Sequence, residues 1–177
     1  PKGEGRTIFT ASFGRYVSAL ANTIANESSG AGLPAILVYQ YFGAPINVDP
    51  NLPRRIEEWH SPALGMNMPI VTYGDRGHPL LLFPTAAADF LENERFFLIK
   101  AVEQAIFAGR IRVFSIESIN RLAWMDDQLP VAEKARRQAL YMDYIENEVV
   151  PYIRRATGDP NARIATSGAS FGAFHAA

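Results

Sequence analysis

Apolar residues recur with two different spacings in the second half of the chain. Short apolar runs predict strands at 68–73, 80–83, 112–116 and 163–166, and the run "LLLF" at 80–83 is apolar at every position. Helical spacing predicts helices at 90–108, with Phe97, Ala101 and Ala105 along one face, and at 131–157, with a kink at Pro151. Strand and helix alternate, and the central strands are apolar on both faces. This pattern predicts an α/β fold with a mostly parallel sheet covered by helices on both faces.

The first fifty residues form a separate series of predicted elements. A β-rich run at 6–10 is followed by a helix from Arg15 and by an apolar strand at 34–42. The stretch "GAPINVDPNLP" at 43–53 is rich in Pro, Gly and Asn and predicts a loop or linker. We therefore expect a strand–helix–strand segment at 1–50 and a larger domain at 51–177.

Composition narrows the classes of protein that this chain can represent. Its 177 residues can bury one good core, and a net charge of −1 gives no field for nucleic acid or an anionic membrane. The chain contains no cysteine, which excludes disulfides and thiolate chemistry, and it has no apolar run of the length that a membrane span needs. These features favour a soluble, cytoplasmic protein, and they leave the oligomeric state open.

The segment "IATSGASFGAF" at 164–174 carries the clearest candidate chemistry. Gly168, Ser170 and Gly172 match the pattern G-x-S-x-G between a predicted strand and a predicted helix. In a nucleophile elbow the serine lies on a sharp turn, and the glycines remove side chains that would clash with the neighbouring strand and helix. Ser170 is therefore a candidate catalytic nucleophile. The alternative is a glycine–serine turn that only packs the helix against the strand.

A nucleophile at this position also needs donors for the oxyanion that forms during acyl transfer. The backbone N–H of Phe171, directly after the serine, is one candidate. The second is expected from the loop "FPTAAADF" after the strand at 80–83, and there from Thr85 or Ala86.

Residues from about 55 to 177 resemble the N-terminal part of an esterase of the α/β-hydrolase superfamily, close to the family of esterase D and the antigen 85 mycolyltransferases. The resemblance is carried by "HPLLLFP", "YIENEVVPYI" and "IATSGASFGAFHA". It implies a serine hydrolase or acyltransferase that acts on carboxylic esters or thioesters, without a cofactor.

In this fold the catalytic acid and histidine follow the serine in the chain. Only "FGAFHAA" follows Ser170 here. His175 lies five residues on, where a short helix cannot return it to the serine oxygen, so we interpret it as a packing residue. We therefore expect the acid and the histidine of the triad outside this sequence, and a chain that is cut short after the elbow.

The two other histidines precede the serine and have simpler interpretations. His78 lies in a turn before a strand, on the side of the sheet away from the expected site, and His60 is flanked by Trp59 and Pro62. Asp75 and His78 have no third partner at metal-ligand spacing, so no metal is predicted.

The segment at 6–50 weakly resembles class 3 lipases of the fungal type. The resemblance is carried by "TASFG" at 10–14 and "FGAP" at 42–45, and it places Ser12 where the lipase nucleophile would be. It implies an alternative triad of Ser12, Asp49 and His60. Thr10 departs from the lipase pattern, because a threonine replaces the first glycine of the turn.

Two functions from different classes remain open at this point. The first is a serine carboxylesterase that acts on a small-molecule ester through Ser170. The second is a non-catalytic hydrolase-like module that binds an acyl ligand or a partner. The sequence does not define the acyl group or the alcohol.

Overall fold

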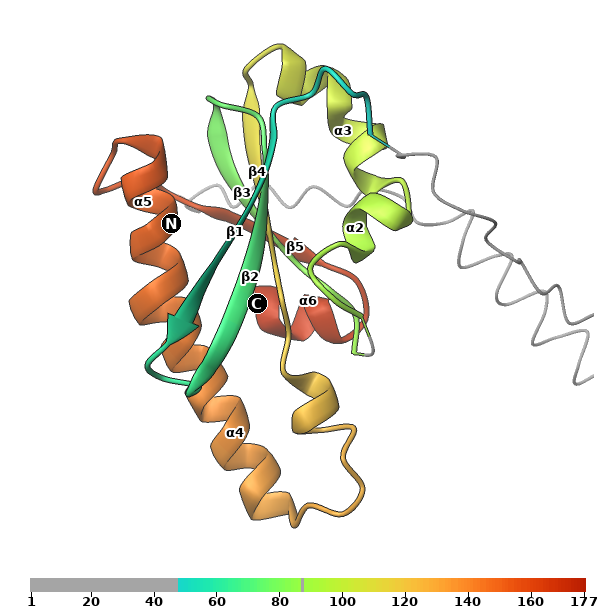
Figure 1. The fold of residues 1–177 in the computed structure, drawn as a ribbon, viewed down its shortest axis with the longest axis vertical. Coiled ribbons are helices and arrows are strands. Elements are labelled where there is room, and N and C mark those ends of the chain that lie inside the picture. The colour runs from blue at the N-terminus through green and yellow to red at the C-terminus, as the bar shows by residue number, and fades with distance from the viewer. Residues whose placement is uncertain (1–47, 87) are drawn as a thin grey trace, which may run out of the picture. The chain divides into compact units, whose positions relative to one another are not determined.

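The computed structural model describes residues 48–86 and 88–177, which build a five-stranded sheet with helices on both faces (Figure 1). The strands are β1 (Arg54–Ser61), β2 (Met66–Tyr73), β3 (His78–Phe83), β4 (Ile111–Ile116) and β5 (Ala165–Gly168). The helices are α2 (Glu92–Arg95), α3 (Leu98–Phe107), the 3-10 turn η1 (Asn120–Leu122), α4 (Val131–Tyr144), the π-helical η2 (Ile145–Val149), α5 (Val150–Thr157) and α6 (Phe171–Ala176).

The sheet has the strand order β1-β2-β4-β3-β5, and β2 runs in the opposite direction to the other four strands. Strand β3 pairs in parallel with both β4 and β5, for example through Leu80 with Val113 and with Ala165. Strands β1 and β2 pair antiparallel with each other, and β2 pairs antiparallel with β4. The sheet is therefore mixed, with β2 as the one antiparallel strand in a sheet whose other four strands share one direction. Only residues 74–77 separate β2 from β3, too few for the crossover of a dozen or more residues that parallel strands require.

The apolar residues of the strands point alternately into two cores, as expected for a sheet with helices on both faces. On β2, Met68 and Ile70 belong to one core, whereas Val71 and Tyr73 belong to the other. The first core packs against α4, η2 and α5, and the second packs against α3 (Figure 1). The prediction of helices on both faces of an α/β sheet is thus confirmed.

Strand β1 was not predicted, because its sequence lacks the apolar alternation of a half-buried strand. It reads RRIEEWHS, and most of its side chains are exposed. Charged residues are common on edge strands, where they oppose pairing with another chain. The charged residues of this segment therefore lie on a strand at the edge of the sheet.

The predicted helix at 90–108 is broken at Phe97. This residue has φ 61° and ψ 13°, and it separates the short helix α2 from α3. The buried residues of α3 include Ile99 and Ile106, while Phe97 is 57 % exposed and Ala101 is exposed. The face predicted from Phe97, Ala101 and Ala105 is therefore not the one that packs on the sheet, because the larger branched side chains face the sheet instead.

The long helix predicted at 131–157 is present as α4, η2 and α5 in immediate succession. The helix continues through Pro151, which lies in the first turn of α5, directly after the π-helical segment. Proline donates no backbone hydrogen bond and is tolerated in a first turn. The sequence suggested a simple kink at Pro151. The structure instead has a change from π-helix to α-helix just before this residue.

Candidate active site

The carboxyl ends of the three parallel strands bring three loops to one edge of the sheet. Residues 84–91 follow β3, residues 117–130 follow β4, and residues 169–170 join β5 to α6. In open α/β sheets, ligands bind at this edge, outside the carboxyl ends of the strands. The loops that carry Thr85 and Ser170 both belong to it.

Ser170 occupies a sharp turn between strand and helix. Its backbone has φ 53° and ψ −120°, a conformation that residues other than glycine rarely adopt. The residue is exposed, and it directly precedes the first residue of α6. The backbone geometry agrees with the one expected from the pattern.

The two glycines around Ser170 are required by close contacts between backbones. A Cβ atom on Gly168 would lie 2.4 Å from the carbonyl carbon of Gly172. A Cβ atom on Gly172 would lie 2.7 Å from the carbonyl oxygens of both Phe83 and Pro84. Contacts this short are closer than van der Waals packing allows. The glycines therefore let the turn after β5 lie directly against the end of β3, next to the loop that contains Thr85.

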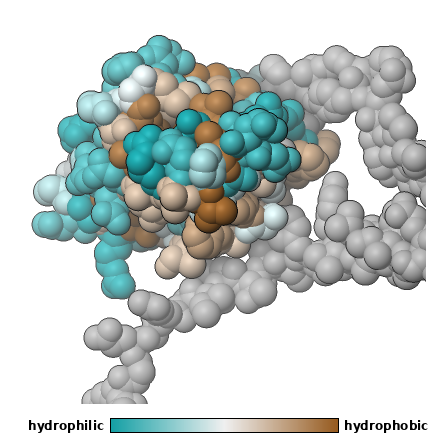
Figure 2. All heavy atoms as spheres, turned by 90° about the horizontal axis from the view of Figure 1, so that it is seen from below, coloured by the Kyte–Doolittle hydropathy of each residue, from teal (hydrophilic) through white to brown (hydrophobic). Residues whose placement is uncertain are grey.

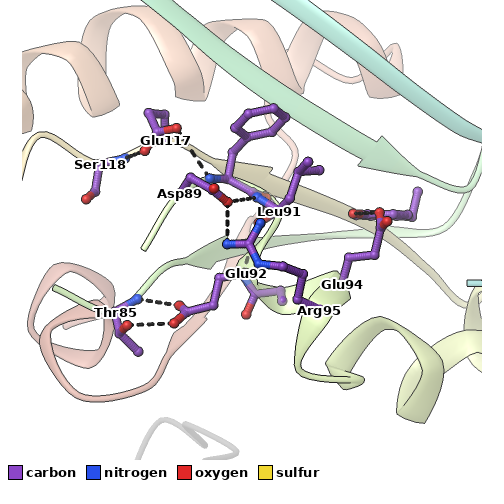
Figure 3. Close-up of polar contacts among 12 residues, drawn as sticks. Thr85, Asp89, Leu91, Glu92, Glu94, Arg95, Glu117 and Ser118 are labelled. Atoms are coloured by element: carbon purple, nitrogen blue, oxygen red, sulfur yellow. Dashed lines mark hydrogen bonds and ion pairs between the residues drawn. The ribbon is translucent and has the colours of Figure 1, made fainter. Parts of the chain in front are cut away.

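The backbone N–H of Thr85 is already bound to a carboxylate in this structure. It donates to Glu92 Oε2 at 2.6 Å, and the Thr85 hydroxyl donates to Glu92 Oε1 at 2.6 Å (Figure 3). Glu92 is buried and is the first residue of α2. Thr85 is therefore not presented as a free oxyanion donor, in contrast to the expectation. Ala86 is a turn residue of the same loop.

Two further acidic residues lie in the loops after β3 and β4 (Figure 3). Asp89 Oδ1 accepts hydrogen bonds from the Arg95 guanidinium at 2.7 Å and from the Leu91 N–H at 2.9 Å. Glu117, directly after β4, accepts a hydrogen bond from the Ser118 N–H at 3.0 Å, and burial raises its pKa. Sequence reasoning missed both Glu92 and Glu117. For Glu117 a signal existed, since it directly follows a buried strand whose carboxyl end lies at this edge.

His175 is buried and lies within α6, as the packing interpretation predicted. Its ring contacts the rings of Tyr141 at 4.9 Å and of Phe171 at 5.1 Å between centroids. Burial lowers its pKa to about 4. A histidine held neutral among rings, with both nitrogens facing amide side chains, is not placed to take a proton from Ser170.

The other two histidines lie away from the turn at Ser170, because His78 is at the opposite edge of the sheet and three strands separate β1, which carries His60, from β5. His78 is the first residue of β3 and is exposed, so it lies at the opposite end of that strand from Thr85. His60 is exposed on β1, and its Nδ1 lies 3.3 Å from Asn67 Oδ1 on β2.

The alternative triad is not assembled by the residues that the structure describes. Asp49 donates its N–H to Glu103 of α3 and precedes β1, whereas His60 lies near the far end of β1. The strand separates them by about 20 Å at the usual rise per residue. Ser12, the third member, lies outside the described residues, as do the elements predicted at 6–42. Asp49 and His60 therefore do not form the pair that this alternative requires.

The described residues contain neither a metal-binding cluster nor a membrane-spanning helix. Within 48–86 and 88–177, no three His, Cys, Asp or Glu residues are grouped so that they could hold a metal ion. No helix in the same part of the chain has both the length and the apolar character needed to cross a membrane.

Comparison with solved structures identifies the fold. The S-formylglutathione hydrolase FrmB of Staphylococcus aureus matches with a TM-score of 0.50 and 17 % identity, over 68 % of this chain and 49 % of that one. A ferulic acid esterase matches with a TM-score of 0.50 and 16 % identity, over 71 % of this chain and 52 % of that one. The chain thus spans about half the length of these structures, and the likeness shows the α/β-hydrolase-type fold of esterases. No family model and no curated protein matches the sequence.

Proposed function

We propose that this chain is part of a serine hydrolase that cleaves carboxylic esters, with Ser170 as the nucleophile. The observation that carries the proposal is the backbone of Ser170. A residue other than glycine is held at φ 53° and ψ −120°, between a strand and a helix, at the carboxyl edge of the parallel strands. Such strain persists only where the surroundings impose it, and it concentrates at functional sites. The esterase-like fold supports the same assignment.

In the proposed reaction the Ser170 oxygen attacks the carbonyl carbon of the ester. Its proton passes to a histidine and then to the departing alcohol, and water later releases the acid from the acyl-enzyme. The Phe171 N–H is a candidate oxyanion donor, because the first N–H groups of a helix have no partner within the helix. Thr85 could serve as the second donor only after Glu92 releases its N–H, and Ala86 is the other candidate.

The base and the acid of the triad are proposed to come from polypeptide outside this sequence. Two facts about the described residues support this. His60 and His78 lie away from the turn, and both nitrogens of His175 face amide side chains at 3.3 and 3.4 Å.

The substrate proposed is a small ester with an apolar part. Phe174, four residues after Ser170, is 60 % exposed, and its ring lies 5.4 Å from that of Phe171 between centroids. Hydrophobic residues also form a band on the surface seen from the end of the molecule at which α4 begins (Figure 2). Leu122, Met125 and Val131 are exposed apolar residues in the segment that leads into α4. This apolar surface could contact an acyl or alcohol group.

A non-catalytic module that binds an acyl ligand is the second candidate. It is favoured by one observation, the occupation of the Thr85 N–H and hydroxyl by Glu92. Such a module would retain the turn without an activated serine.

A fluorophosphonate probe separates the two candidates, because it reacts only with an activated serine. We expect the intact protein to be labelled at Ser170, and Ser170→Ala to abolish the labelling. Ser12→Ala is the matched control, because Ser12 lies in the similar stretch "TASFG". Labelling that persists in Ser170→Ala, or that is absent from the intact protein, would contradict the proposed nucleophile.

A further inference from the structure

A chain of neutral hydrogen bonds connects α6 with α4 and η1. The Trp124 indole N–H donates to Gln138 Oε1 at 3.0 Å. Since an indole nitrogen can only donate, this bond fixes the orientation of the Gln138 amide, whose Nε2 lies 3.3 Å from His175 Nδ1. His175 Nδ1 is therefore the acceptor. The remaining ring nitrogen, Nε2, lies 3.4 Å from Asn120 Oδ1 and donates to it.

Both contacts are satisfied together by one neutral tautomer, with the proton on Nε2. His175 is 5 % exposed, and its ring is in contact with aromatic rings from three elements: Phe83 of β3, Tyr141 of α4, and Phe171 with Phe174 of α6. His175 thus forms hydrogen bonds to α4 and η1, and its ring contacts the end of β3 and α4. The residue belongs to α6, a helix of six residues. That helix begins directly after Ser170.

We propose that His175 is a positioning residue, which in its neutral form holds α6, and with it the strained turn at Ser170, against α4 and η1. It does not touch the reacting atoms. The helix has six residues, its buried residues are Gly172 and His175, and the strand before it is exposed. An effect of His175 on catalysis rests on the proposed function. Its effect on the conformational order of the turn at Ser170 does not.

Protonation should weaken this anchor. A charged ring would present N–H donors at both nitrogens, and one of them would face the Gln138 Nε2 donor. The titratable group in ring contact is Tyr141, whose hydroxyl donates to the Glu117 carbonyl at 2.7 Å and whose pKa is raised by burial. Two cationic side chains of α4 face the segment that contains η1. Lys134 donates a hydrogen bond to the Trp124 carbonyl, and Arg137 donates one to the Leu122 carbonyl.

The sign of the pH dependence follows from the lowered pKa. The histidine takes up a proton near 6.5 when α6 is released, but only near 4 when it is docked. Docking is therefore complete above about pH 6.5 and weakens as the pH falls from there to 4, because the released state binds the proton first.

Hydrogen exchange of the amides of Gly172 and Ala173 reports this docking without any assay of activity. These amides close the turn by donating to Ala169 O at 2.9 Å and Ser170 O at 3.0 Å. In the intact protein at pH 7, His175→Phe keeps an aromatic ring but loses both hydrogen bonds, and exchange should be about tenfold faster. His175→Gln keeps a donor and an acceptor, so its exchange should stay closer to that of the unmodified protein.

The pH profile is the second measurement. After correction for the intrinsic rates, protection of Gly172 and Ala173 in the unmodified protein should fall between pH 6.5 and 4. This fall should be absent in His175→Gln, which cannot titrate. Amides of β3 and β4 serve as the control for global unfolding. If His175→Phe does not fold, the pH dependence of protection in His175→Gln, compared with that of the unmodified protein, tests the proposal by itself.

Equal exchange in His175→Phe and the unmodified protein at pH 7 would overturn the proposal, and so would a fall in protection that persists in His175→Gln. The rate of fluorophosphonate labelling should decrease in His175→Phe by a factor similar to the increase in the hydrogen-exchange rate of Gly172 and Ala173. Absence of labelling in the unmodified protein would refute the proposed function. The hydrogen-exchange data would still test whether His175 positions the turn.

Discussion

Two residues other than glycine have positive φ angles in the described part of the chain, and they differ in what holds them there. Phe97 has φ 61° and ψ 13°, in the left-handed region that residues at helix ends sometimes adopt. Ser170 has φ 53° and ψ −120°, a combination that is much rarer for a residue with a side chain. Phe97 is 57 % exposed between two helices, whereas the turn of Ser170 is flanked by two glycines in backbone contact.

The difference separates a local irregularity from a conformation that the surroundings impose. The structure around Phe97 requires only that one helix end and another begin. Around Ser170, by contrast, Gly168 touches Gly172, and Gly172 touches the end of β3. Strain that several independent contacts maintain is the kind associated with functional sites. The comparison therefore supports the proposal of a functional role for Ser170, whereas it gives no such support for Phe97.

The largest expected effect concerns ester hydrolysis. Ser170→Ala should reduce the turnover of a short p-nitrophenyl ester by several powers of ten, because loss of a triad nucleophile has effects of this size. Phe97→Ala should leave turnover nearly unchanged, since the ring is exposed. Steady-state kinetics on the intact protein measure both. Comparable losses in the two variants would remove the distinction between the two sites.

The second expected effect concerns the glycine that packs the turn against β3. In Gly172→Ala the new Cβ would lie 2.7 Å from two backbone carbonyl oxygens that cannot rotate away. We expect the free energy of unfolding to fall by about 1–3 kcal/mol, the usual cost of overpacking, and hydrolysis to fall with it.

Gly158→Ala is the matched control for this experiment. Gly158 ends α5 with φ 72°, and a Cβ there would meet no atom within 4 Å. Its substitution should cost about 1 kcal/mol from backbone strain alone and leave hydrolysis intact. Denaturant unfolding gives both values. If Gly172→Ala proved as mild as Gly158→Ala, the close packing of the turn would not be what holds Ser170.

The same two regions show how far the sequence could predict this molecule. The turn at Ser170 was predictable because G-x-S-x-G reports a local steric need, and its context of strand and helix was visible in the apolar pattern. The break at Phe97 was not, because "ENERFFLIK" has helical spacing and contains no glycine or proline. The direction of β2 and the existence of β1 depend on pairing between strands, which periodicity along one segment does not encode.

The candidate site shows the same limit. Ser170, its glycines and the neighbouring loop follow from a motif, whereas the bonds from Thr85 to Glu92 depend on how the loop folds back on α2. The network around His175 joins residues 120, 138 and 175, and no spacing in the sequence relates them.

The smallest expected effect tests the strain itself. Replacing either residue of positive φ by glycine removes the steric conflict between its Cβ and its backbone, but adds conformational entropy to the unfolded chain. For Phe97→Gly these contributions should nearly cancel, because the left-handed region is only moderately unfavourable and the exposed ring loses little packing. For Ser170→Gly the relief of strain should prevail, because its conformation is the rarer one and its side chain is exposed. We expect a gain of up to about 1 kcal/mol in the free energy of unfolding, together with complete loss of hydrolysis. Denaturant unfolding of the two variants beside the unmodified protein measures the difference. A Ser170→Gly variant less stable than the unmodified protein would show that the serine side chain stabilises the turn, and would contradict the view that strain is held there for catalysis.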